Sequence, residues 1–238
     1  MNIMKTRIFS LVVALAALGL MSCNEWLDLT PTDRVSDKSA WESQESTDLY
    51  INNFYEYIAI YGSFGDQQFV GNLTEGLTDT FKYGSPILGT RAGDSNHYVF
   101  TPETMSSAGS MLDCWTNTYT RIRRINEFLA AQQNYSTYSE EVNTLYEAQA
   151  RFFRAFLYFQ LAKRHGGQAI IFNTLAETVK DKPLASAAEM WQYIYDELTF
   201  AAETLPAEWN SANKGRVTKG AAYAMLCRAM LYAERWAD

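Results

Sequence analysis

Apolar and polar residues recur with a helical period along the second half of the chain. Positions three, four and seven apart share one face of an α-helix. From about residue 112, large apolar side chains follow those intervals, and they are Trp115, Tyr119, Ile122, Phe128 and Leu129. The spacing predicts an amphipathic helix at the start of a helical region that extends to about residue 236.

Start and stop signals divide the rest of this region into three more helices. TYSE, from Thr137, and SAAE, from Ser186, have the form of a capping box, in which a hydroxyl and a glutamate side chain each accept a backbone N–H of the first turn. The first of these helices should end at HGG, residues 165–167, because glycine suits a left-handed cap. The second should end before Pro206, and the third lies in GRVTKGAAYAMLCRAMLYAERW.

The first half of the chain predicts one helix and one long loop. SAWE, from Ser39, is a third capping-box pattern, and it predicts a helix over about 40–60. Its expected buried face consists of Trp41, Leu49, Phe54, Ile58 and Tyr61. The following segment, about 62–103, is rich in Gly, Ser, Asp and Asn but also carries aromatic residues, which disordered segments tend to lack. We expect this loop to be ordered, irregular and functional.

The helical region contains an internal repeat. Trp115, Tyr119, Ile122 and Leu129 recur 76 residues later as Trp191, Tyr195, Leu198 and Leu205, and Ala150, Arg154, Ala155, Leu157 and Tyr158 recur 74 residues later as Ala224, Arg228, Ala229, Leu231 and Tyr232. Large residues on one helix and small alanines on the next resemble tetratricopeptide repeats. We therefore expect a mainly α fold with tetratricopeptide-like helix pairs over about 112–236. Because such pairs stack on neighbours, a chain that stops after two of them is expected to be truncated.

The N-terminus predicts a lipoprotein signal peptide over residues 1–22. Lys5 and Arg7 precede an uncharged run, Ile8 to Leu20. Its thirteen residues would form a helix about 20 Å long, short of the roughly 30 Å hydrocarbon core of a membrane. Leu20, Ser22 and Cys23 resemble the bacterial lipobox, in which the cysteine is lipidated. A secretory peptide with an accidental cysteine is the alternative.

Composition and residue types exclude several functions. Removal of residues 1–22 changes the net charge from −7 to −9, and such an acidic chain is not expected to bind nucleic acid. Cys114 and Cys227 lie in apolar helical patterns and should stay unpaired. With two histidines, His97 and His165, and no H-E-x-x-H pattern, the sequence predicts no metal and no cofactor; His165 should cap its helix.

No motif in the sequence predicts a catalytic site. A G-x-S-x-G pattern is missing, and the loop acids are Asp66, Glu75, Asp79 and Asp94. Two of them would suffice for a glycosidase, but acids in a glycine-rich loop are more often turn formers. We predict that the protein is not an enzyme, with a surface glycoside hydrolase as an alternative.

The whole pattern resembles the SusD/RagB family of surface nutrient-binding lipoproteins. The matching pieces are CNEWLDLTPTDRVSD, TEGLTDTF, CWTNTYTRIRRIN, EAQARFFRAFLYFQLAKRHGG and GRVTKGAAYAMLCRAMLYAERW. Members are usually about twice as long, so the resemblance implies that residues 23–238 are the N-terminal part of a SusD-like domain. It also implies a lipid-anchored outer-membrane protein, facing the exterior, that captures a glycan or other nutrient for a SusC-like TonB-dependent transporter.

The loop supplies the candidate ligand contacts. Sugar rings stack on aromatic faces, and polar side chains bind their hydroxyls. The candidates are Phe81, Tyr83, Asn96 and Tyr98, with His97 beside them. Packing of these residues against the helices is the alternative role. A tetratricopeptide scaffold lipoprotein that binds an envelope protein is the rival function, although such a scaffold does not need this loop.

Replacing Cys23 with alanine is expected to abolish lipid attachment, because the thiol that would carry the acyl chain is removed. Metabolic labelling of wild type and Cys23→Ala with a fatty acid measures this. Equal labelling of the two proteins would contradict the lipobox assignment.

Overall fold

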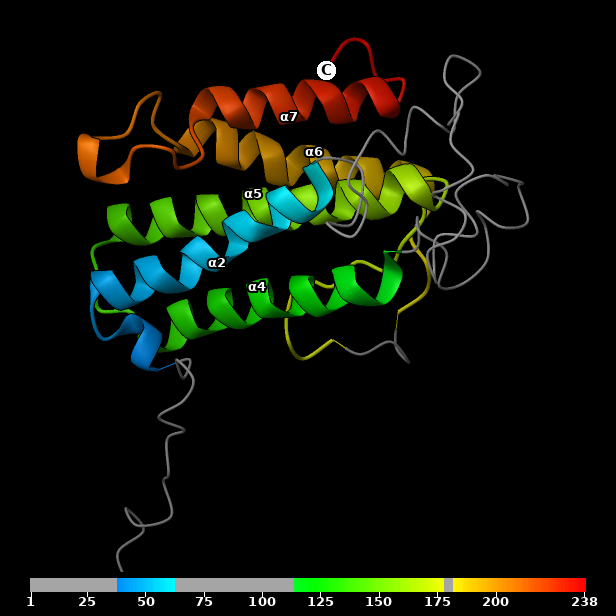
Figure 1. Cartoon of the computed structure of the whole chain (residues 1–238). Coiled ribbons are helices and arrows are strands. Elements are labelled where there is room, and N and C mark those ends of the chain that lie inside the picture. The colour runs from blue at the N-terminus through cyan, green and yellow to red at the C-terminus, as the bar shows by residue number, and fades with distance from the viewer. Residues whose placement is uncertain (1–37, 63–113, 178–181) are drawn as a thin grey trace, which may run out of the picture. The chain divides into compact units, whose positions relative to one another are not determined.

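The computed structural model describes residues 38–62, 114–177 and 182–238 (Figure 1). Within these ranges the structure is helical, and no residue lies in a β-strand. The described residues fall within one unit, Asp37–Asp238. The prediction of a mainly α fold is confirmed. The signal peptide and the loop over 63–113 lie outside the described residues.

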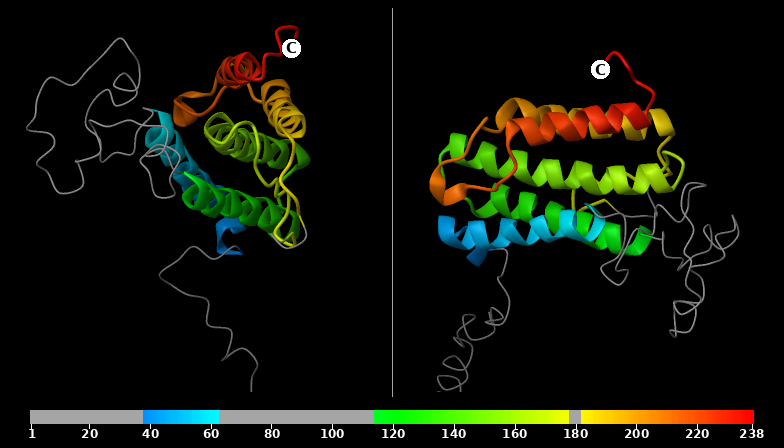
Figure 2. Two further views of the ribbon diagram at one scale, coloured as in Figure 1. Left: turned by 90° about the vertical axis from the view of Figure 1, so that its right-hand side faces the viewer. Right: turned by 45° about the horizontal axis from the view of Figure 1, so that its top comes forward.

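The described elements are two short 3₁₀ turns and five α-helices. In chain order they are η2 (Ser39–Trp41), α2 (Gln44–Gly62), α4 (Trp115–Tyr135), α5 (Glu140–Arg164), α6 (Ala187–Thr204), η6 (Ser211–Asn213) and α7 (Lys219–Tyr232). The long helices run alongside one another, with α4 and α5 antiparallel and α6 and α7 antiparallel (Figure 2). These are the two helix pairs that the repeat predicts.

Helix α5 lies at the centre of the packing. It contacts α2, α4 and α6, and every residue from Phe152 to Ala162 is buried. A helix that is apolar on all sides needs neighbours on all sides, and the aromatic and alanine-rich sequence of α5 fits that position. The rest of the fold is arranged around this one helix.

Two of the predicted helix boundaries are confirmed in atomic detail. The Ser186 hydroxyl accepts the N–H of Glu189, and the Glu189 side chain accepts the N–H of Ser186 at 2.8 Å, which completes the capping box. Helix α5 ends with His165 as its C-cap. Gly167 follows with φ +77°, and an added Cβ there would lie 2.9 Å from the Cβ of Ala187. Glycine is therefore required at this position for both conformation and space.

The other two predicted starts are wrong by a few residues. Helix α2 begins at Gln44, where the Ser43 hydroxyl accepts the N–H of Ser46 at 3.1 Å, so Ser39 is not its cap. Ser139, not Thr137, caps α5. Nearby serines compete for the same role, and the pattern alone does not rank them.

The expected buried face of α2 is only partly correct. Trp41, from η2, and Phe54 are buried, but Leu49 is 60% exposed. Leu49 and Phe54 are five residues apart, which is about 140° around a helix, so they lie on nearly opposite faces of α2.

The repeat predicts which residues are buried on the first helix of each pair, but it predicts burial less well on the second helix. On α4 and α6, Ile122 and Leu198 are fully buried, and the tryptophans and tyrosines of the stripe pack against the core. On α5 the repeated residues are all buried, but on α7 only Ala229 is; Ala224, Arg228, Leu231 and Tyr232 are exposed. Cys227 is also exposed, whereas Cys114 is buried, and both thiols are free as expected.

One buried ionic cluster joins three helices. The Glu197 carboxylate of α6 accepts hydrogen bonds from Nε of Arg151 at 2.9 Å and Nε of Arg154 at 2.8 Å, both on α5. Arg154 also donates to the side chain of Asn126 on α4 at 2.8 Å. Only 4% of Glu197 and 6% of Arg154 is exposed. The cluster satisfies charges that would be costly to bury alone.

No helix among the described residues is long and apolar enough to cross a membrane.

Replacing Ala229 or Ala155 with leucine is expected to destabilise the protein. Both alanines are completely buried between helices, and overpacking such a site costs about 1–3 kcal/mol. The denaturant midpoint measures the loss. Ala224→Leu, on the exposed side of α7, is the matched control and should leave the midpoint almost unchanged. Unchanged midpoints for both buried variants would contradict the helix-pair packing.

Candidate binding groove

The candidate residues from the sequence lie outside the described ranges. Phe81, Tyr83, Asn96 and Tyr98 fall within 63–113, and Cys23 falls within 1–37. Their roles as ligand contacts and as the lipidation site therefore stay predictions.

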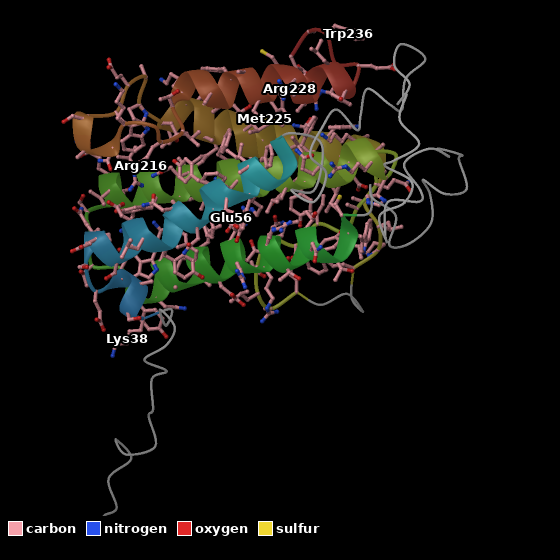
Figure 3. The ribbon with its side chains drawn as sticks, viewed as in Figure 1. Lys38, Glu56, Arg216, Met225, Arg228 and Trp236 are labelled. Atoms are coloured by element: carbon pink, nitrogen blue, oxygen red, sulfur yellow. The ribbon has the colours of Figure 1, made fainter. Side chains whose placement is uncertain are left out.

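The described residues form a small groove of their own beside the N-terminal halves of α2 and α5. Its volume is about 150 Å³, and the segment between α6 and α7 forms its third side. Figure 3 labels Arg216 on this segment, close to both helices. The lining residues are Gln44, Asp48, Val142, Leu145, Tyr146, Gln149, Trp209, Asn213 and Arg216.

An ion pair between two of the lining residues crosses from α2 to the segment before α7. Nη2 of Arg216 lies 2.8 Å from Oδ1 of Asp48, and the Tyr146 hydroxyl donates to the same oxygen at 2.8 Å. Burial, and then the hydrogen bond to Asp48, raise the pKa of Tyr146 above its ordinary value. The tyrosine therefore stays protonated and acts as a donor at neutral pH.

A chain of hydrogen bonds holds the segment before α7 in place. The Gln149 side-chain oxygen accepts from the Tyr55 hydroxyl at 3.2 Å and from Arg216 at 3.3 Å. The Tyr55 oxygen accepts the N–H of Val217 at 2.9 Å, and the indole of Trp209 donates to the Val217 carbonyl at 2.8 Å. These bonds connect α2, α5 and a segment more than 150 residues from α2 in the sequence.

The chemistry of the groove suits hydrogen bonding and not catalysis. Asp48 is the one carboxylate that lines it, and that carboxylate is already paired. Gln44 and Asn213 add amide groups to its lining, and Trp209 adds an aromatic ring. Among the described residues there is also no group of three or more His, Cys, Asp or Glu side chains placed to hold a metal ion. The arrangement can hold a small polar group or water.

Sequence reasoning did not find this groove. Its residues come from α2, from α5 and from the segment that contains GRVTKG. No periodic pattern links positions so far apart, and an arginine beside a glycine in a connecting segment is not distinctive by itself. The contact between Asp48 and Arg216 becomes visible only when the helices are packed.

Comparison with known proteins gives the class of protein. A family model described as "Starch-binding associating with outer membrane" matches residues 25–231. The chain therefore belongs to the SusD-like family, which confirms the resemblance seen in the sequence. No curated protein matches the chain.

Solved structures agree with the family and with the helical fold. A SusD-like protein from Bacteroides fragilis is 29% identical, with a TM-score of 0.68 over 87% of this chain and 38% of its own. A SusD-like carbohydrate-binding protein from the same species is 25% identical, with a TM-score of 0.57, over 82% of this chain and 38% of its own.

A more distant match shares the fold alone. Surface glycan-binding protein A from Bacteroides uniformis is 20% identical, with a TM-score of 0.61, over 81% of this chain and 42% of its own. The chain spans about two fifths of the length of these structures.

Replacing Arg216 with methionine is expected to lower the free energy of unfolding by about 1–3 kcal/mol. The variant loses the hydrogen bonds of the guanidinium, and a hydrogen bond to a charged group contributes an energy of this magnitude. Only 10% of the Arg216 side chain is exposed. Arg123→Met is the control: its side chain is 67% exposed and pairs with Glu127 within one helix, so it should change stability by less than about 1 kcal/mol. Equal losses for the two variants, measured by chemical denaturation, would rule out a structural role for the groove network.

Proposed function

We propose that this protein is an outer-membrane lipoprotein that binds a glycan or another nutrient at the cell surface and delivers it to a SusC-like TonB-dependent transporter. The observation that carries the proposal is the family match over residues 25–231. Similarity to a SusD-like carbohydrate-binding protein supports the glycan as ligand. The anchor in this proposal is acylated Cys23.

The protein acts in this proposal as a binding protein and not as an enzyme. The described groove contains a single, paired carboxylate, whereas a glycosidase uses two carboxyl groups on either side of the scissile bond. The alternatives are a scaffold that binds an envelope protein and a surface glycoside hydrolase. A scaffold would bind no glycan, and a hydrolase would release reducing ends from the glycan that it binds.

The ligand contacts in this proposal lie in the loop before α4. Phe81, Tyr83 and Tyr98 supply stacking faces, and Asn96 supplies a hydroxyl partner. The described part of the chain supports this placement indirectly, because the aromatic residues of α6, and those of α4 other than the terminal Tyr135, pack against the core. Those rings are occupied by packing, so the loop is the better source of free aromatic faces.

Replacing Tyr83 or Tyr98 with alanine is expected to weaken glycan binding with little loss of stability. An exposed stacking ring contributes about 0.5–1.5 kcal/mol beyond its buried area, whereas truncation of a buried aromatic residue costs roughly 3–5 kcal/mol of stability. Affinity by calorimetry and unfolding by denaturant are measured on the whole chain. Tyr135→Ala is the control, because Tyr135 is exposed on α4 and should change neither quantity. Strong destabilisation by both loop variants, or normal binding by both, would contradict the site.

A further inference from the structure

The groove beside α2 and α5 has more hydrogen-bonding capacity than its own contacts use. Arg216 and Tyr146 both contact Oδ1 of Asp48, which leaves the second oxygen, Oδ2, to accept hydrogen bonds from a ligand. The side chain of Asp48 is 35% exposed, so the carboxylate can be reached from solvent. Because two donors already hold it, its orientation is fixed before a ligand arrives, which lowers the entropic cost of binding.

Two amide side chains lie beside this carboxylate in the lining. Gln44 is exposed at the start of α2, and Asn213 is half-buried in η6. Asn213 is held in its turn through its backbone N–H, which donates to the side chain of Asn210 at 3.0 Å. An amide side chain both donates and accepts hydrogen bonds, so each of the two can pair with a hydroxyl group.

Trp209 adds an aromatic ring whose position is fixed. Its indole N–H donates to the Val217 carbonyl at 2.8 Å, and the residue is half-buried and packs against the core. A ring held in this way loses little further freedom when a ligand stacks on it. An apolar face beside polar groups suits the C–H face of a sugar ring.

A more open depression adjoins the groove and enlarges the surface. Its volume is about 440 Å³, and Leu145 lines both. The groove itself has room for about five water molecules, at roughly 30 Å³ each. The depression brings the combined space into the range of ligand sites. Its other lining residues, all with side-chain oxygens, are Glu140, Glu141, Thr144 and Thr204.

The charges of this surface favour a neutral ligand. Asp48, Glu140 and Glu141 contribute three carboxylates to the two linings. The cation among the lining residues is Arg216, whose side chain is only 10% exposed and is already paired with Asp48. Carboxylates repel anions at short range but accept hydrogen bonds from hydroxyl groups, so a neutral sugar fits better than a phosphate or an acidic sugar.

The groove lies away from both ends of the loop that carries the proposed ligand contacts. Asp48 and Gly62 are 14 residues apart on α2, which is about 21 Å along a helix. Helix α4 begins towards the same end of the bundle as α2 ends, whereas Arg216 lies towards the other end (Figures 1 and 3). The groove is therefore a different surface from the ends of the loop.

We propose that the groove and the adjoining depression form a second glycan subsite, which takes a neutral sugar unit. The ring of Trp209 stacks on the sugar, and Asp48, Gln44 and Asn213 bind its hydroxyl groups. This inference rests on the proposed function, in which the protein binds a glycan. Two subsites on one chain give a long glycan two points of attachment, and the second attachment gains from the high effective concentration.

The indole N–H of Trp209 reports on the groove directly. Trp209 is one of six tryptophans, and its NMR signal is the one that disappears in Trp209→Phe. The whole chain, with isotope-labelled tryptophan, is titrated with the methyl glycosides of glucose, galactose, mannose, xylose and N-acetylglucosamine. Glucuronic acid and lysine are the anionic and cationic comparison ligands. At least one neutral glycoside is expected to shift the Trp209 signal to saturation.

A matched pair of double variants tests the amide contacts. Gln44→Ala combined with Asn213→Ala is expected to raise the Kd of that glycoside about tenfold, which corresponds to about 1.4 kcal/mol. Gln133→Ala combined with Asn134→Ala is the control, because these amides are exposed on α4 and do not line the groove, so the Kd should not change. The unfolding midpoint of each variant separates loss of binding from loss of the fold.

Three results would overturn the inference. In the first, no neutral glycoside shifts the Trp209 signal to saturation. In the second, glucuronic acid or lysine shifts it as strongly, so that the surface does not select a neutral sugar. In the third, the Gln44 and Asn213 variant binds as tightly as wild type.

The loop variants distinguish this inference from the proposed function. Tyr83→Ala combined with Tyr98→Ala should leave the Trp209 response to the glycoside unchanged, because the groove does not include the loop residues. If wild type binds a glycan polymer and the loop variant does not, while the Trp209 signal responds to no glycoside, the proposed function stands and the second subsite is wrong. If the loop variant loses the Trp209 response, the groove is not a separate subsite.

Discussion

The buried carboxylate of Glu197 is the contact on which the arrangement of the helix pairs depends. It receives both Arg151 and Arg154, so α6 fits against α5 in one register. A shift of one residue would move the carboxylate by about 1.5 Å along the axis and about 100° around it, and neither guanidinium would follow. Leaving a buried charge without its partner costs about 3–5 kcal/mol, more than a single apolar contact contributes. The ion pairs therefore select one packing among several that apolar surfaces alone would tolerate.

The same cluster explains how distant parts of the chain come together. Arg154 extends it to Asn126 on α4 and to the carbonyl of Asn173 in the connection after α5. Once α4, α5 and α6 are fixed, the segment before α7 can reach the N-terminal half of α5, where Arg216 meets Asp48 of α2. The groove is thus a consequence of how α5 is surrounded. Its polar groups are mostly occupied by one another, which is the behaviour of a structural junction.

The sequence predicts helices well because helix formation is local. The capping box at Ser186 and the glycines after His165 act within one turn, and both were found from the pattern. The start of α2 differs from the prediction because Ser39 opens a short 3₁₀ turn, η2, in which Trp41 packs on Phe128 with ring centres 4.9 Å apart, and α2 begins only after Ser43. The groove could not be predicted, because Asp48 and Arg216 meet only through the tertiary fold. The loop residues of the candidate ligand site remain predictions, because they lie outside the described residues.

Residues at matching positions of the repeat differ in burial. Arg154 and Arg228 occupy matching positions in the sequence repeat, as do Leu157 and Leu231, yet the first of each pair is buried and the second is exposed. The identity of the residues does not decide their burial: Leu157 has helices on all sides, whereas Leu231 lies on the exposed side of α7. One of the helices around α5 is α6, which supplies a carboxylate and aromatic rings. The repeat thus carries information about which residues form helices, whereas the burial of each residue depends on the helices that surround it.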